Sequence, residues 1–529
     1  MTGRCRNAVT GAFSSVAFLP TVAILLLVLA GCGQEAGPVV FNAQLRSSPS
    51  TLDPATTTSI YTLAVGDRIF DGVVKLNREN GGVAPNLAES WEISDDGLVY
   101  TFKLRDGIRF HNGRPITAAD VKYSWERVLA PETASPHVYL LEMIEGATAF
   151  HAGDADAVSG IRPLDDQRFE VRLAERDETF LYLLAIGATV IVPREAIEEL
   201  GPRFGQAPVG SGPFRLARWA RDFRIELEPF AEHYEPPAVD RLIYHVLPEG
   251  EESVRLFETG DLDLAVHVPP HRQDDLRQRY ATSLRELPSF GWGGFGFRCD
   301  QPPFDDARVR QAIRLAIDRL ALADALGQPR HTAAFGIIPP AVPGHEPTTR
   351  EAGADLERSR ALLAKAGYPN GDGLPLLLYA NRHGNEAVGE LIAAALAEIG
   401  LRVRIELHSF QTIVDGVESG RFNFFYLGWT GGFPDPDVYL RPIVHSRSGP
   451  NISRYSNPEV DAWLDAARAE GDPERRTALY QQAEQRVLED APYVALYHWD
   501  EVFLLHERWK GIPLGLRPEY LEIERAFLP

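Results

Sequence analysis

The stretch Glu386-Ala-Val-Gly-Glu-Leu-Ile-Ala-Ala-Ala-Leu-Ala-Glu-Ile-Gly-Leu-Arg-Val-Arg-Ile-Glu-Leu407 joins two hydrophobic patterns. The first part has apolar residues at helical spacing, namely Val388, Leu391, Ile392, Ala395, Leu396 and Ile399. Gly400 stands where a helix ends, and the alternation that follows is typical of a strand, at Val403, Ile405 and Leu407. A helix followed directly by a strand predicts an α/β lobe.

Neighbouring segments extend this lobe. The nearly continuous apolar run Phe422-Asn-Phe-Phe-Tyr-Leu-Gly428 predicts a strand that is covered on both faces. The next residues, Trp429-Thr-Gly-Gly-Phe-Pro-Asp-Pro-Asp437, predict a loop without regular structure at the end of that strand, which is where ligands tend to bind in such sheets. Further helices are predicted from Asp305 through Leu320, from Leu356 to Ala366 and from Glu474 to Glu489, and a strand from Ala491 to Tyr497.

The first half of the chain is mostly strands and turns. Apolar residues alternate from Leu98 to Leu104 between the turn dipeptides Asp96-Gly97 and Asp106-Gly107. Thr117-Ala-Ala-Asp120 is typical of a helix start, and more strands are predicted at 169–173 and 223–227. Because roughly 500 residues exceed the usual limit of a single core, at least two lobes are expected.

The N-terminal residues have the pattern of a secretory signal peptide. Arg4 and Arg6 precede the apolar run Val22–Ala30, and Gly31-Cys32 follows it. Leu29-Ala-Gly-Cys32 resembles a bacterial lipobox, which implies a lipid on Cys32. The alternative is an uncleaved membrane anchor, which is less favoured because an anchor has no need of a cysteine there.

Composition excludes several functions. The net charge of -21 argues against nucleic acid as a partner. Cys299 is the one cysteine outside the signal and the proposed lipid site, so no intrachain disulfide is expected. The 14 histidines are scattered, which predicts no metal site and no cofactor. Neither a Gly-x-Ser-x-Gly elbow nor a His-Glu-x-x-His motif is present, so no enzyme activity is predicted.

Five segments in order resemble one known family. The most specific is APNLAESWEISDDGLVYTFKLRDGIRFHNG (residues 84–113), which continues into Thr117–Lys122. The others are Pro208–Phe214, Pro303–Ile313, Ala366–Gly371 and Tyr455–Asp461. Together they resemble the dipeptide- and oligopeptide-binding proteins of ABC importers, the family-five solute-binding proteins.

The resemblance implies a two-lobed α/β periplasmic-binding-protein fold (type II, cluster C) with an extra β-rich subdomain in lobe I. The implied boundaries are a signal peptide at 1–31, a lipidated tether at 32–40, lobe I at 41–288, lobe II at 289–498 and a return to lobe I at 499–529. The inserted subdomain is expected at about 73–190.

The function implied is capture of a small solute, a peptide or a peptide-like molecule, and its delivery to an ABC permease by hinge closure. The protein is expected to be a monomer on the periplasmic or extracellular face of a bacterial membrane, held by the lipid on Cys32. Two alternatives stay open, which are a non-peptide solute and a sensory receptor.

The resemblance also suggests ligand-binding residues. Relatives usually have an aspartate three positions after the tryptophan of this loop, where it pairs with the α-ammonium of a peptide; here Gly432 stands at that position. Asp435 or Asp437 could replace it or shape a turn, or the ligand has no amine there. Arg382 falls where relatives bind a ligand carboxylate, or else it is a surface arginine. The remaining candidates are Tyr61, Trp292, Tyr379, Trp429, Thr430, Gly431 and Tyr455.

Overall fold

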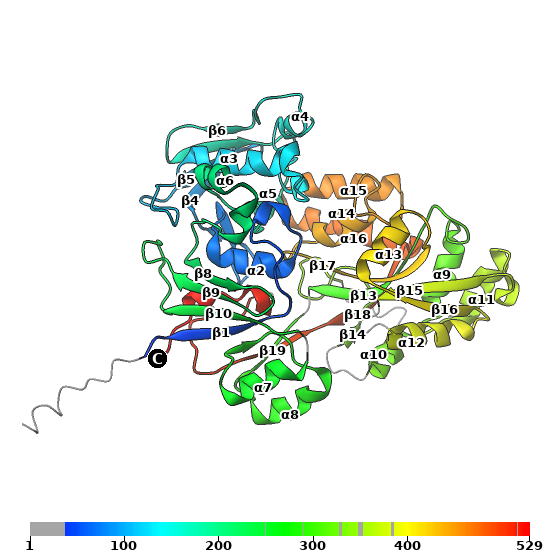
Figure 1. Ribbon diagram of the computed structural model, residues 1–529. Helices are drawn as coiled ribbons and strands as arrows, with labels where there is room; N and C mark the ends of the chain where they lie inside the picture. Colours follow the sequence, from blue (N-terminus) through cyan, green and yellow to red (C-terminus); the bar gives the residue numbers. More distant parts are fainter. Residues whose placement is uncertain are drawn as a thin grey trace, which may run out of the picture. The chain divides into compact units, whose positions relative to one another are not determined.

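The computed structural model describes residues 37–248, 250–288, 290–326, 331–346, 353–381, 386–515 and 517–529. Val40–Pro529 is one compact unit, and it contains the helices and strands that follow (Figure 1). The predicted signal peptide, Cys32 and Arg382 lie outside the described residues. Among the helices of the described part, none is both long and apolar enough to cross a bilayer.

Lobe I is built on a seven-stranded sheet of order β12-β19-β11-β1-β10-β9-β8. β1 is parallel to both of its neighbours, β10 and β11. The strands are β1 Val40–Leu45, β8 Phe214–Ala220, β9 Arg224–Pro229, β10 Arg241–Val246, β11 Leu264–Ala265, β12 Leu284–Leu287 and β19 Glu501–Leu505, and the helices are α2 Ile60–Ile69, α7 Glu251–Thr259 and α8 Gln273–Arg279. Strands from both ends of the chain thus share one sheet.

A β-rich subdomain is inserted in lobe I, as predicted. Its four-stranded sheet has the order β4-β5-β7-β6, and a two-stranded ribbon, β2-β3, lies apart from it. α3 begins at the predicted start, where the N–H and Oγ1 of Thr117 donate to Asp120 Oδ2 at 2.8 and 2.9 Å. The elements are β2 Val74–Leu76, β3 Val83–Pro85, β4 Ala88–Ile93, β5 Val99–Leu104, β6 Ile161–Pro163, β7 Arg168–Arg172, α3 Ala118–Leu129, α4 Ala147–His151, α5 Phe180–Leu184 and α6 Arg194–Leu200.

Lobe II is built on a six-stranded sheet of order β14-β18-β13-β17-β15-β16. Alternate residues of β17 pack into two different hydrophobic clusters, so both faces of this strand are covered, as its continuous apolar run predicts. Gly294 lets β13 and β18 approach closely, because an added Cβ would lie 2.0 Å from Val494 O. The strands are β13 Gly291–Phe297, β14 His331–Ala333, β15 Pro375–Asn381, β16 Arg402–His408, β17 Phe424–Thr430 and β18 Tyr493–Trp499.

Helices cover both faces of the lobe II sheet (Figure 1). α12 connects the parallel strands β15 and β16, as a parallel pair requires. The positive φ of Gly400, +82°, allows the chain to leave this helix. The helices are α9 Ala307–Leu315, α10 Arg319–Ala325, α11 Leu356–Lys365, α12 Glu386–Ala397, α13 Phe410–Glu418, α14 Asp437–Val444, α15 Pro458–Ala469 and α16 Pro473–Asp490.

These sheets and their helices confirm the predicted two-lobed α/β class, but two local predictions were wrong. The helix expected from Asp305 through Leu320 is divided into α9, capped by Asp306, and α10, capped by Asp318. Leu320 is 53% exposed rather than part of the buried stripe. The strand β17 also continues two residues further than expected, through Trp429 and Thr430.

Candidate functional site

The predicted ligand residues of lobe II gather where β13 and β17 run side by side. In their antiparallel pairing Trp292 lies opposite Trp429, and Gly291 lies opposite Thr430. Trp292 is 1% exposed and packs edge-on against Tyr493, with ring centroids 6.0 Å apart. Trp292 is therefore a core residue, whereas Trp429 and Thr430 are half-buried at the end of the strand.

The segment Gly428–Asp437, here called the binding loop, runs from the end of β17 into α14. Trp429 fixes its two ends together, because the indole Nε1 donates to Val438 O at 2.7 Å. Gly431 N–H donates to Phe290 O at 3.2 Å, which ties the middle of the loop to the residue before β13. These bonds give the binding loop a defined course.

Two adjacent glycines of the binding loop differ in the space around them. A Cβ added to Gly431 would lie 2.6 Å from the ring of Tyr439, a fully buried side chain. A Cβ added to Gly432 would meet no atom within 4 Å, and this residue is exposed. Position 432, where relatives place an aspartate, is therefore open to a side chain, while position 431 is not.

Both carboxylates of the binding loop are engaged by arginines. Asp435 accepts two hydrogen bonds from the Arg476 guanidinium, at 2.7 and 3.0 Å. Asp437 Oδ1 lies 3.0 Å from Arg441 Nε, and its Oδ2 lies 3.8 Å from Arg468 Nε. Burial alone would raise the pKa of Asp437, but Arg468 and Arg441 hold it below its ordinary value. Each of these carboxylates is buried and stabilises the course of the loop.

Two of the predicted tyrosines lie in the interior of lobe II. Tyr379 is 8% exposed and stacks on Phe422, with centroids 3.6 Å apart. Tyr455 is 4% exposed, and its hydroxyl donates to Asp490 Oδ2 at 2.7 Å. Both side chains support the sheet and its helices rather than lining an open surface.

Tyr61 is the candidate from lobe I. It lies in the first turn of α2 and is half-buried, with the Arg46 guanidinium 6.0 Å from its ring centroid. Burial raises the pKa of the Tyr61 hydroxyl, which is therefore protonated at neutral pH. The remaining candidates, Arg382 and the lipidation site Cys32, fall outside the described residues.

Sequence reasoning missed a contact between the binding loop and lobe I. Phe433 is 1% exposed and stacks on Tyr182 of α5, with centroids 5.0 Å apart and planes at 10°. It belongs to the hydrophobic core of the subdomain. Pro434 lies against Gly81 of the β2–β3 turn, where a Cβ would come within 2.5 Å of Pro434 Cγ. The Pro-rich composition of this segment predicts a loop, but nothing in it identifies the partner.

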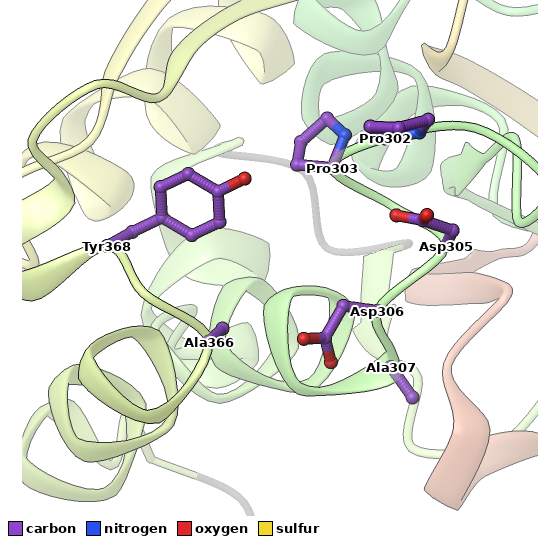
Figure 2. A pocket seen from close by; sticks show the side chains of 7 residues that line it. All are labelled: Pro302, Pro303, Asp305, Asp306, Ala307, Ala366 and Tyr368. Atoms are coloured by element: carbon purple, nitrogen blue, oxygen red, sulfur yellow. The ribbon is translucent and has the colours of Figure 1, made fainter.

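Two surface hollows are lined by other residues. One lies in lobe II, where Tyr368 points across the opening toward Pro303 (Figure 2). Asp305 and Asp306 lie on the side of the hollow opposite Tyr368. The second, in lobe I, is polar and includes Arg68, Asp71, Asn86, His233 and Glu524 in its lining. None of the predicted ligand residues lines these two hollows.

Metal and thiol chemistry find little support. Among the described residues there is no group of three or more His, Cys, Asp or Glu side chains that could hold a metal ion. Burial raises the pKa of Cys299 to about 11, so this thiol is protonated at neutral pH and is a poor nucleophile.

Comparison with known proteins agrees with this architecture. Residues 82–451 match the model of the bacterial extracellular solute-binding proteins, family 5 (middle region). This chain belongs to that family. Its members are substrate-binding components of ABC importers, so this chain is an extracytoplasmic solute-binding protein and not an enzyme.

Individual relatives cover nearly the whole chain. "Probable di/tripeptide-binding protein 5" of Pseudomonas aeruginosa is 29% identical over 90% of this chain and 94% of its own. "Probable deoxycholate-binding periplasmic protein YgiS" of Escherichia coli is 29% identical over 92% and 93%. The E. coli murein tripeptide-binding protein MppA is similar in structure, with a TM-score of 0.81 at 25% identity over 93% of this chain and 99% of MppA. A structure of MppA described as its unliganded open form gives 0.75, at 25% identity over 93% and 98%.

Proposed function

We propose that this solute-binding protein captures a small peptide or peptide-like solute between its lobes and delivers it to an ABC permease. The observation that supports this most directly is the position of the binding loop, which leaves the lobe II sheet and contacts Tyr182 of lobe I through Phe433. In this proposal Trp429, Thr430 and Gly432 contact the solute, together with Tyr61 from lobe I. The buried residues Trp292, Tyr379, Gly431, Asp435 and Tyr455 support them.

Delivery proceeds by hinge closure in this proposal. The chain leaves the first sheet after Leu287, enters the second at Gly291, and returns between Trp499 and Glu501, so two crossings near each other provide a hinge. The TM-score is 0.81 against one MppA structure and 0.75 against the unliganded open form of MppA. This difference supports the idea that members of the family adopt more than one arrangement of their lobes. The lobe boundaries 41–288, 289–498 and 499–529, with an insert at 73–190, belong to the same proposal.

The proposal includes a lipid anchor. The signal peptide 1–31 would be removed and the lipid on Cys32 would hold the protein, through the tether 32–40, at the outer face of a membrane. The sequence Leu29-Ala-Gly-Cys32 supports this because it resembles a lipobox. Two or three acyl chains on Cys32 would be enough for stable attachment to the membrane. The protein would act there as a monomer close to its permease.

The binding loop also favours a second candidate, a solute without a free amine. Position 432 has no carboxylate, and Asp435 and Asp437 are already paired with arginines. An ammonium enclosed at this position would lose hydration without gaining a counter-charge. Deoxycholate, named for the relative YgiS, is an example of an amine-free solute. A sensory role would use the same site and differ only in the membrane partner.

Native mass spectrometry of the purified full chain tests the ligand class directly, because a co-purified solute is identified by its mass. A peptide would support the first candidate, and an amine-free acid or neutral molecule the second. Gene deletion followed by uptake of the labelled solute tests transport. Unchanged uptake with a lost signalling response would contradict the transport proposal.

A further inference from the structure

The contact between the binding loop and lobe I extends beyond Phe433. The segment Arg176–Tyr182 follows β7 and includes the first residues of α5, and it faces the end of α15 and the turn that follows it. Glu178 N–H donates to Arg468 O at 2.9 Å, a backbone hydrogen bond from lobe I to lobe II. A Cβ added to Gly471 would lie 2.0 Å from an Arg176 guanidinium nitrogen, so the arginine rests directly on that glycine.

An arginine is shared across this contact. Arg468 Nε lies 3.0 Å from Asp177 Oδ2 of lobe I and 3.8 Å from Asp437 Oδ2 of lobe II. Asp177 is held in place because its Oδ1 accepts from Thr179 N–H at 2.9 Å and from Thr179 Oγ1 at 2.6 Å. The side chain of Asp177 is 4% exposed and that of Arg468 is 25% exposed, so the ion pair is largely shielded from water.

We propose that these residues form a latch between the lobes. The latch consists of Phe433 in the subdomain core, the Asp177–Arg468 ion pair and the Glu178–Arg468 backbone bond. The proposal takes the arrangement in which these contacts form as the closed one. Through the latch, contacts between the two lobes, and not the solute alone, stabilise that arrangement and fix the binding loop. The inference rests on the hinge motion proposed above.

The chemistry of the latch makes it reversible. Opening would expose the Phe433 ring to water, which opposes separation. Arg468 would lose Asp177 but keep Asp437 beside it, so no arginine is left without a carboxylate, and Asp177 would become hydrated. Because an uncompensated buried charge is the costly outcome in such pairs, this arrangement lets the lobes separate without one. Both the apolar contact and the ion pair therefore hold the lobes, and because Arg468 is shared with Asp437, separating the ion pair leaves no buried charge unpaired.

In this proposal the latch affects the apparent affinity of the protein for its solute. If the closed arrangement is the one that holds solute, its population in the free protein multiplies the apparent affinity. Loss of the latch would then weaken binding of every solute by the same factor. A residue that contacts only one chemical group would instead affect some solutes and spare others.

Hydrogen exchange on the full chain, with no solute added, tests the latch because Glu178 N–H bonds across the lobes. Phe433→Ala should accelerate exchange in segments 175–182 and 466–471 by about tenfold or more. Asp177→Asn, tested separately, should also accelerate exchange in both segments. Exchange in β1 and β13, within the two sheets, should not change. Ile443→Ala is the matched control, since Ile443 is also 1% exposed but packs inside lobe II.

Two results would overturn the latch. One is exchange at 175–182 that is identical in Asp177→Asn, Phe433→Leu and the unmodified chain. The other is acceleration that spreads equally through β1 and β13, which indicates general destabilisation. Phe433→Leu keeps an apolar side chain and covers the case in which Phe433→Ala fails to fold. Since no solute enters the measurement, a failed uptake experiment would contradict the proposed transport function and leave this result standing.

Discussion

The two halves of the binding loop differ in nearly every physical respect. In residues 428–432, Gly428 and Gly432 are exposed, and no atom crowds position 432. In residues 433–437, Phe433, Asp435 and Asp437 are buried. Phe433 stacks on an aromatic ring, and the two aspartates form ion pairs with arginines. Ten consecutive residues thus contain an open surface followed by a fixed anchor.

This difference separates recognition from support. A substitution at the open position 432 changes what the surface offers to a solute at little cost to folding, whereas one in the second half removes a buried partner. Ligand specificity can therefore vary at position 432 within one stable loop. The predictions below test this separation, starting with the anchor.

The largest effect is expected for Arg476→Met, which leaves the buried Asp435 carboxylate without its bidentate partner. We expect a loss of about 3 kcal/mol in the free energy of unfolding, measured with urea. The double variant Asp435→Asn/Arg476→Met should recover part of that loss, because no charge is then buried alone.

The control for this experiment is the neighbouring Arg475→Met. The Arg475 side chain is 72% exposed, although it also lies near acidic residues, so its loss should cost less than about 0.5 kcal/mol. Equal destabilisation by the two variants would mean that the second half of the loop is not anchored by Arg476.

Glu484 lies on α16, the helix that also carries Arg476. Its buried carboxylate is bound by backbone N–H donors, whereas Asp435 is bound by an arginine. It accepts from Ile337 N–H at 2.6 Å and Ile338 N–H at 2.8 Å, and burial raises its pKa from 4.5 to about 7. Between these two pH values the folded chain keeps a proton that the unfolded chain has lost. This group should therefore lower the free energy of unfolding as pH rises from about 4.5 to about 7, by up to about 3 kcal/mol.

Glu484→Gln should remove that slope, because glutamine has no proton to lose in this range. Urea unfolding at about pH 5 and about pH 8 measures the difference. The exposed Glu489 on the same helix provides the control, Glu489→Gln. A slope that persists in Glu484→Gln would assign the pH dependence to other groups.

Regular elements with a clear period were predictable from the sequence. The start of α3, the stripe of α12 and the continuous apolar run of β17 each match a local rule, so the elements appear where those rules place them. The break between α9 and α10 was missed because the apolar spacing continues across it, while Asp318 starts a new helix. Spacing reports a common face, but it does not report where the backbone changes direction.

Side-chain roles in the binding loop were less predictable. Trp292 and Tyr455 were candidate ligand-binding residues because aromatic side chains suit a binding cleft, and the structure places both in the lobe II core. Phe433 was not proposed, because its partner Tyr182 is about 250 residues away in sequence. A contact between distant segments leaves no periodic signal in either one.

Within the first half of the loop, the crowded position 431 and the open position 432 are compared by substituting these neighbouring glycines. Gly431→Ala places a Cβ 2.6 Å from the ring of Tyr439, whose hydroxyl donates to Phe290 O at 2.8 Å. We expect a loss of about 1–3 kcal/mol in the free energy of unfolding from this overpacking. Gly432→Ala should change it by less than about 0.5 kcal/mol. The thermal midpoints of both variants provide the comparison, and a larger loss for Gly432→Ala would contradict the open surroundings of position 432.

The smallest effect on folding, but an informative one on binding, is expected for Gly432→Asp. The new carboxylate would fill open space and offer the counter-charge that an α-ammonium needs, so affinity for peptides with a free amino end should rise by about tenfold. Calorimetry with a tripeptide and its N-acetylated form separates this charge effect from general binding, since only the free amine should gain. Gly449→Asp adds the same charge at another exposed, uncrowded glycine and should leave both affinities unchanged. If the unmodified protein already binds the free-amine tripeptide tightly and Gly432→Asp has no effect, then position 432 does not face the amino end of the solute, and the open half of the loop has another role.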